Sequence, residues 1–276
     1  MGGIRGRLGA GPARGLDRAM NARGRIAVEL DEVGRARIAV LRSDPPLLVR
    51  PTPEAVYLVG GAAGPLGGDD LRFEIHVAAG ASLTVRTAAA SMALPGPTGS
   101  ASRFDVEARV GAGATLRWLP EPTIAVAGCC HRMRTVITAD PGARVVWREV
   151  VVFGRHGEVP GSYRTRMDLE VADRPVLRHE VAVGRDAWGC DTSPVVDQAR
   201  GFGSVLVVDP AWSDRPPASL VLGEGAAVFP LAGPAAYVST LAADTTTVLQ
   251  ALGAGFAYLQ GLAPETDGNL KPNGRA

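Results

Sequence analysis

The 276-residue sequence is poor in aromatic residues, has almost no lysine and has almost no net charge. Aromatic side chains make up 5% of the chain, so a buried core has to be built mainly from valine, leucine, isoleucine and alanine. The 29 basic residues include a single lysine, Lys271, and the 28 acidic residues reduce the net charge to +1. Because a general nucleic-acid footprint requires a basic excess, we expect no nucleic-acid partner.

Cysteine and long apolar runs are also scarce. Of three cysteines, Cys129 and Cys130 are adjacent, and three cysteines do not make a disulfide framework. The arginines near the start are not followed by the apolar stretch of a secretory signal. No run of about 18 uncharged apolar residues occurs, and the nearest approach, residues 251–262, is interrupted by glycine. These absences predict a cytoplasmic protein without a membrane partner.

Glycine and proline are abundant instead, with 35 and 21 residues. The glycines show no period of three, which excludes a collagen-like chain, and a hydrophobic content of 46% argues against disorder. Many turn residues together with small and β-branched apolar residues favour strands over long helices. We divide the chain into a flexible N-terminal arm (1–23), a single β-rich domain (24–262) and a disordered tail (263–276).

The first part of the domain has the pattern of a hairpin followed by an edge strand. Two runs of strand composition, 25–31 and 37–42, flank a turn at Val33 and Gly34. The next segment, 44–53, contains four prolines. Because proline cannot donate to a strand ladder, this segment is predicted to be extended at the edge of a sheet.

An internal repeat is the most informative feature of the sequence. Its copies start at Phe73, Val106, Thr135 and Met167, which gives spacings of 33, 29 and 32 residues. Each copy has alternating apolar residues on both sides of a turn, and the fourth copy lacks the Gly-Ala turn of the others. One such unit cannot bury its apolar face alone, so neighbouring units must stack. We predict a mainly all-β fold of stacked sheets with a solenoid-like repeat of about 30 residues.

A short helical element is expected near the C-terminal end of the domain. Apolar residues in the segment 238–262 recur at steps of three and four, which is typical of an amphipathic helix. Gly253 and Gly255 weaken this helix.

The densest group of possible metal ligands is Cys129, Cys130 and His131. Thiolate and imidazole bind late divalent metals such as nickel. A closed zinc site needs four ligands, and a second pair at zinc-site spacing is missing from the sequence. The segment is therefore interpreted in three ways: a turn with packed thiols, a transient metal contact, or a structural zinc site completed from elsewhere.

Two further polar groups stand beside glycines, namely Asp69 with Asp70 and the segment 154–158. Glycine lets the backbone approach closely, so these carboxylates are either solvated turn residues or groups that face a channel or a partner. Paired carboxylates on a β-solenoid would also suit a carbohydrate-active enzyme, although few aromatic residues are present to bind a sugar. Nucleophile-elbow, metalloprotease and phosphate-loop motifs are absent, so the residues alone contain no catalytic signature.

Five short motifs follow one another along the chain, at residues 42–47 (RSDPPL), 64–71 (GPLGGDDL), 80–90 (GASLTVRTAAA), 118–124 (WLPEPTI) and 154–158 (GRHGE). In this order they resemble the UreD (UreH) family of urease accessory proteins, in its actinobacterial-type branch. The resemblance extends from about residue 24 to 210, whereas the chain past 210 matches poorly.

This resemblance implies a non-enzymatic scaffold with a mostly β, helix-poor fold. Such a scaffold would bind urease apoprotein subunits and UreF, and through UreF the GTPase UreG. Together these proteins would insert Ni²⁺ into the urease active site in a GTP-dependent manner, with a polar path through the UreD-like protein as the route. No tightly bound cofactor is expected, only transient Ni²⁺.

The same resemblance suggests which residues would contact nickel. Asp69 and Glu158 are the leading candidates, because carboxylates outside a closed site would bind the ion weakly enough to release it. Where much of the family has Pro-Gln-Glu, this chain has Pro-Glu-Pro at 120–122, so Glu121 is displaced by one position and is not included. The complete candidate set is Asp69, Glu158, His156, Cys129, Cys130 and His131.

Overall fold

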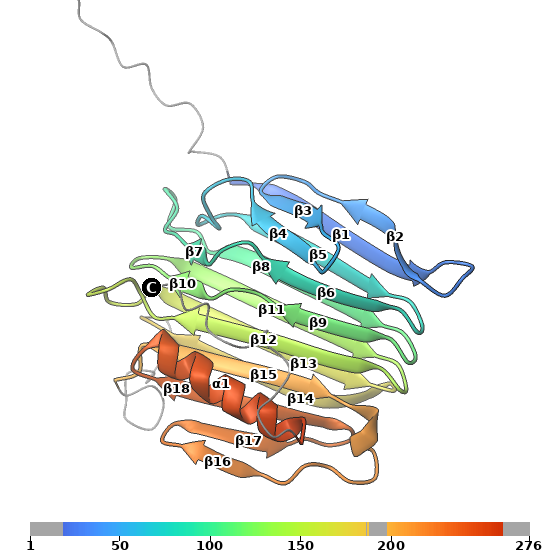
Figure 1. Ribbon diagram of the computed structural model, residues 1–276. Helices are drawn as coiled ribbons and strands as arrows, with labels where there is room; N and C mark the ends of the chain where they lie inside the picture. The colour runs from blue at the N-terminus through green and yellow to red at the C-terminus, as the bar shows by residue number, and fades with distance from the viewer. Residues whose placement is uncertain (1–18, 186, 188–197, 262–276) are drawn as a thin grey trace, which may run out of the picture.

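The computed structural model describes residues 19–185, 187 and 198–261, and it consists of two stacked β-sheets with one helix on an outer face (Figure 1). The seven-stranded sheet has the order β14 (Arg174–Val183), β13 (Ser162–Val171), β11 (Cys130–Ala139), β8 (Ser102–Val110), β5 (Asp70–Val77), β1 (Asn21–Leu30), β2 (Ala36–Arg42). The eleven-stranded sheet has the order β16 (Leu220–Gly223), β17 (Ala226–Pro230), β18 (Ala235–Ala242), β15 (Gly201–Val208), β12 (Arg144–Val152), β9 (Thr115–Leu119), β6 (Ser82–Thr87), β4 (Val56–Gly60), β3 (Leu47–Pro51). Two short strands complete it: β10 (Thr123–Ala125) pairs with β12, and β7 (Ser91–Ala93) pairs with β10.

The repeat builds a solenoid, as the sequence predicts. In the first three copies the first strand lies in the seven-stranded sheet and the second strand lies in the eleven-stranded sheet. Equivalent strands of successive copies then pair in parallel: β5 with β8 and β8 with β11 in one sheet, and β6 with β9 and β9 with β12 in the other. Each four-residue connection therefore crosses from one sheet to the other, and the copies stack as rungs.

Glycine permits these crossings. Each connection places a glycine in the left-handed region, with φ values of 71°, 65° and 80° at Gly80, Gly113 and Gly142. The alanine that follows each glycine is buried and points into the core. The Gly-Ala pair thus turns the chain and closes the end of the sandwich.

The fourth copy folds differently. Its strands β13 and β14 pair antiparallel within one sheet, joined by Ala172 and Asp173. Both residues have positive φ, 50° and 59°, as in the two-residue turns that favour hairpins. The fourth copy therefore ends the stack with a hairpin at the sheet edge.

The N-terminal expectations for the hairpin and the edge strand are confirmed. β1 and β2 pair antiparallel, and the proline-rich segment supplies β3 at the edge of the larger sheet. β1 begins at Asn21, three residues before the expected domain start. Residues 1–18 of the expected arm, and the expected tail 263–276, lie outside the described residues.

The C-terminal helix is present but shorter than its predicted range. α1 covers Thr245–Leu259, and the side chain of Asp244 caps it by accepting a hydrogen bond from the backbone N–H of Thr247 (2.9 Å). Val238 belongs to β18, which is mostly buried because the inner core lies on one side and α1 on the other. Val238 and Leu241 of this strand are three residues apart, which also fits one step of a helix, so the predicted helix began too early. Among the described residues, no helix is long and apolar enough to cross a membrane. A short 3₁₀-helix spans Pro210–Trp212.

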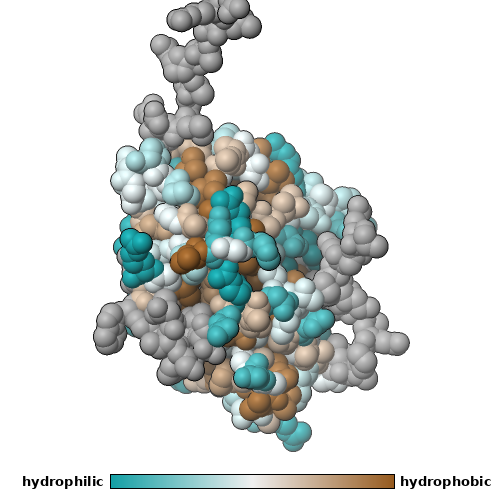
Figure 2. All heavy atoms as spheres, turned by 90° about the vertical axis from the view of Figure 1, so that its left-hand side faces the viewer, coloured by the Kyte–Doolittle hydropathy of each residue, from teal (hydrophilic) through white to brown (hydrophobic). Residues whose placement is uncertain are grey.

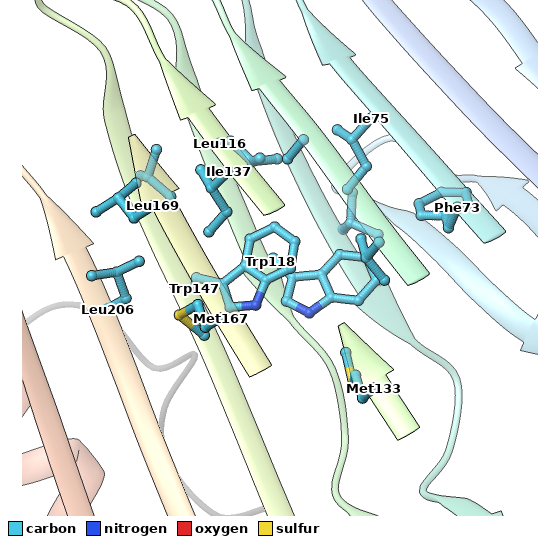
Figure 3. Packing of buried hydrophobic residues seen from close by; sticks show 14 of the residues in the cluster. Phe73, Ile75, Leu116, Trp118, Met133, Ile137, Trp147, Met167, Leu169 and Leu206 are labelled. Atoms are coloured by element: carbon cyan, nitrogen blue, oxygen red, sulfur yellow. The ribbon is translucent and has the colours of Figure 1, made fainter. Parts of the chain in front are cut away.

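The main core lies between the sheets. Trp118 and Trp147 stack at its centre, with ring centroids 4.9 Å apart, and Phe73 approaches Trp118 at 6.0 Å (Figure 3). A second cluster forms on the outer face of the larger sheet, where Val248 and Leu252 of α1 pack against β15 and β18. The protein therefore has two apolar layers that share one sheet.

Candidate functional site

A cavity of about 360 Å³ lies between the two sheets, near the end of the molecule that carries β7 and β10 (Figure 1). The segment 120–122 separates β9 from β10 here, so the wall of the larger sheet is interrupted. Residues of both sheets line the cavity, together with the loops 60–65 and 87–92. Figure 2 shows this end of the molecule, where hydrophilic and hydrophobic groups lie side by side.

Glu149 lines the cavity from β12 and is 5% exposed. Its carboxyl oxygens accept hydrogen bonds from Thr135 Oγ1 (2.8 Å), Thr165 Oγ1 (2.9 Å) and Trp147 Nε1 (3.3 Å). Burial raises the pKa of Glu149, and these three donors lower it to a smaller extent. A carboxyl group in this setting holds its proton to a higher pH than an exposed one.

His131 lines the same cavity from β11. Its Nδ1 lies 2.8 Å from Ser102 Oγ, and its ring centroid lies 5.3 Å from that of Tyr163. Burial lowers the pKa of His131 to about 4, so the imidazole is neutral at pH 7, which is the form that binds metals. His131 also lines a second cavity of about 40 Å³, together with Cys130 and Arg164.

Of the two cysteines beside His131, only Cys130 faces the opposite side of the sheet. Successive strand residues face opposite sides of a sheet: Cys129 and His131 are buried, whereas Cys130 between them is half-buried. Burial and the neighbouring Cys130 raise the pKa of Cys129 to about 11, which keeps its thiol protonated at pH 7. Across the described residues, no three His, Cys, Asp or Glu side chains form a group that could hold a metal, so a closed zinc site is not formed there.

Asp69 uses both of its carboxylate oxygens within the fold. It is 2% exposed, and it accepts hydrogen bonds from the backbone N–H groups of Met20 and Leu66, each at 2.8 Å. Because Gly64 and Pro65 of the same loop line the cavity, Asp69 fixes one part of the cavity wall without itself lining it.

Glu158 has a similar role in the loop that follows β12. It accepts from the side chain of Arg155 (Nε, 2.7 Å) and from the backbone N–H groups of Arg155 (3.0 Å) and Ala127 (3.3 Å). The guanidinium of Arg155 is the main cause that lowers the pKa of Glu158 to about 2. His156 is exposed in the same loop.

Of the six candidate residues, only His131 lines the large cavity. The sequence analysis missed Glu149, Met133 and Tyr163, which line it with His131. The inward direction of Glu149 follows from the sequence pattern. Glu149 lies two residues after the apolar Trp147 in the same strand, and residues two apart in a strand face the same side, so its carboxyl group has to face the core.

Comparisons with known proteins agree with the resemblance seen in the motifs. Residues 21–265 match the model of the family described as UreD urease accessory protein. A urease accessory protein UreD of Streptomyces avermitilis is 41% identical over 84% of this chain and 95% of the relative. Another from Streptomyces coelicolor is 40% identical over 87% of this chain and 97% of the relative. A third UreD protein, from a Parafrankia species, is 40% identical over 84% of this chain and 86% of the relative.

Proposed function

The chain belongs to the UreD family of urease accessory proteins, and from this membership we propose that it is a non-enzymatic cytoplasmic scaffold for urease maturation. It binds urease apoprotein subunits and the UreF–UreG complex, and it supports GTP-dependent insertion of nickel into the urease active site. In this proposal Ni²⁺ is a passing cargo and not a resident cofactor.

The inter-sheet cavity is the observation that carries the nickel part of the proposal. It presents an imidazole (His131), a thioether (Met133) and two carboxyl groups (Glu121 and Glu149) within a wall that is mostly apolar. These groups can contact a late divalent metal, and the described residues provide no closed set of ligands that would retain it.

The six candidate residues then divide into three groups. We assign His131 to direct contact with nickel in the cavity, and we keep Cys129, Cys130 and His156 as candidates for transient contacts outside it. Asp69 and Glu158 act mainly as positioning residues, because their oxygens already accept several hydrogen bonds that hold loops at this end of the molecule.

Rescue of a deletion strain tests the function directly. The strain lacks this protein but retains the urease subunits and the other accessory proteins, and the wild-type chain is supplied in trans. We expect urease activity, nickel content of the purified urease, and co-purification with UreF and the urease subunits all to be restored. Full activity without the chain, or a chain that purifies alone, would overturn the scaffold function.

A pair of matched variants tests the role of the cavity. Ala90→Trp places a large side chain on the loop that lines the cavity, whereas Ala112→Trp places the same side chain in a connection outside it. We expect Ala90→Trp to retain the complex but lower the nickel content of urease, while Ala112→Trp preserves both. Equal nickel contents with both complexes intact would show that nickel does not use this cavity.

The comparisons favour this accessory role over the carbohydrate-active enzyme considered from the sequence, because the relatives are named as accessory proteins. We therefore propose no second function.

A further inference from the structure

Three arginines form a row on the outer face of the eleven-stranded sheet. Arg50 on β3 lies opposite Tyr57, and Tyr57 lies opposite Arg86 on β6. Arg86 in turn lies opposite Leu119, and the register of β9 with β12 places Leu119 beside Arg148. The row crosses five neighbouring strands, with an arginine on every second one.

The alternation of each strand sets the direction of these side chains. The neighbours Val49, Val85 and Trp147 belong to the core between the sheets, so the arginines project from the opposite face. This is the face on which α1 packs. In Figure 1, α1 lies in front of β15 and β18, and no described helix covers β6 and β9.

Several arginines elsewhere in this nearly neutral protein form ion pairs with acidic residues, whereas the three arginines of the row form none among the described residues. Arg144 pairs with Asp209 and Arg155 with Glu158, for example. Within the described chain, Arg50, Arg86 and Arg148 form no ion pair with Asp or Glu. Glu121 acts electrostatically on Arg148 but does not form an ion pair with it among the described contacts.

Arg148 shows most clearly that the row lacks compensating partners. It is 6% exposed, and its guanidinium donates to the backbone carbonyls of Leu119 (3.4 Å) and Pro120 (2.7 Å). Its Nε is buried without a hydrogen-bond partner. Burial lowers the pKa of Arg148, and the nearby charge of Arg86 lowers it further, although Glu121 raises it. Arg148 is thus a buried cation, and a buried cation is unfavourable unless an anion compensates it. Arg86 is half-buried and Arg50 is exposed, and the described residues place no carboxylate in ion-pair contact with any of the three.

We propose that Arg50 and Arg86, the accessible members of this arginine row, form the docking surface for an acidic face of a protein partner in the urease maturation complex, with the buried Arg148 adding positive charge beside them. The identity of the complex rests on the proposed function, whereas the chemistry of the surface does not. Two strand spacings separate successive arginines, or about 10 Å. Carboxylates seven residues apart on an α-helix have nearly the same separation, about 10.5 Å. A net charge of only +1 favours a protein partner over nucleic acid.

The test reverses the charge of the two outer members and leaves the buried Arg148 in place. Arg50→Glu/Arg86→Glu is compared with Arg35→Glu/Arg174→Glu, which changes charge equally at two exposed positions away from the row, one in the β1–β2 turn and one at the first residue of β14. Circular dichroism and thermal unfolding establish that both variants fold. Affinities for purified apo-urease and for UreF are then measured at 50 and 200 mM salt. We expect the row variant to bind one of these partners about tenfold more weakly at low salt and to lose most of the salt dependence.

A designed probe separates the kinds of ligand. Wild type is titrated with a helical peptide that carries glutamate at every seventh position, with its glutamine counterpart, and with single-stranded DNA of equal charge. The inference requires the glutamate peptide to bind most tightly. Tighter binding of DNA, or equal binding of the two peptides, would overturn it. If wild type binds apo-urease and UreF, and the row variant binds each of them as tightly as wild type does, the docking surface is wrong but the proposed function stands. If wild type binds neither partner, the proposed function itself fails.

Discussion

At the scale of single residues, buried polar groups decide where this protein departs from a simple apolar sandwich. Glu149 lies between the sheets with three hydrogen-bond donors around it, whereas Asp69 and Glu158 direct their oxygens at backbone N–H groups of loops. A buried carboxyl group is expensive unless it is neutral or fully hydrogen-bonded. These three acids therefore have different consequences when they are changed.

Glu149→Gln is expected to alter the pH dependence of stability. The folded state raises the pKa of Glu149 above its ordinary value, near 4.3. Above that pH the unfolded chain has already released this proton, whereas the folded protein still holds it. Wild type should then lose stability relative to Glu149→Gln as pH rises from 4 until the folded pKa is passed, by at most about 1.4 kcal/mol per pH unit. Urea unfolding of both proteins between pH 4 and 8 measures this difference. A difference that does not change with pH would contradict the elevated pKa.

Asp69→Ala is expected to destabilise the protein even before any effect on urease is considered. It removes an acceptor from the N–H groups of Met20 and Leu66, and a buried unsatisfied donor costs about 1–3 kcal/mol. Asp69→Asn keeps one side-chain oxygen and should cost less. Chemical unfolding ranks the two variants, and equal stability of Asp69→Ala and wild type would argue instead for a role in contact with nickel.

For these three acids, the sequence predicts some features of the side chains and not others. Residue type and flanking glycines identified Asp69 and Glu158 as unusual, but their partners come from other segments, such as Met20 for Asp69 and Ala127 for Glu158. No local pattern contains those contacts. The inward direction of Glu149, by contrast, follows from strand alternation and could have been predicted.

At the scale of elements, the connections between repeat strands control the architecture. The sequence predicts the positions of the turns after β5, β8, β11 and β13, and the structure confirms them. It does not predict which turns cross between sheets, because a hairpin and a crossing both call for residues that tolerate left-handed backbone. Gly113 crosses, whereas Ala172 and Asp173 turn back within one sheet.

Gly113→Ala isolates the backbone cost of one crossing. A Cβ at Gly113 would meet no atom within 4 Å, so the expected loss of about 1–2 kcal/mol comes from the left-handed conformation (φ 65°) alone. Ala172→Gly is the reverse change, at a residue that already has φ 50°. It should cost less, because glycine relieves the strain at that position. Urea unfolding measures both, and a loss at Ala172→Gly as large as at Gly113→Ala would contradict this account.

At the scale of the whole molecule, one sheet serves two apolar layers. The repeat alone predicts the inner layer, since period-2 alternation marks a face that neighbouring rungs must cover. The outer layer was only partly predictable, because β15 and most of β18 are buried on both faces, so their apolar residues do not alternate with exposed polar ones. Predicting the cavity would also have required knowing that residues 120–122 interrupt the wall of the sheet.

Gly203→Val tests whether the outer layer is separable from the inner one. A Cβ at Gly203 would lie 2.5 Å from Val248 Cγ1 and 2.8 Å from Leu252 Cδ1, so valine must displace α1. Since the inner core does not include the helix residues, we expect the sandwich to persist while α1 detaches. Limited proteolysis should then cleave near α1 and leave a resistant β-rich fragment, as judged by mass spectrometry and circular dichroism.

The matched control is Thr246→Val, which adds a valine to the exposed side of the same helix. It should leave the protease resistance of α1 unchanged, because no packed neighbour has to move. If Gly203→Val instead unfolds the entire chain in one step, the two layers form a single cooperative unit. The helix would then be part of the stabilising core and not an attachment to its outer face.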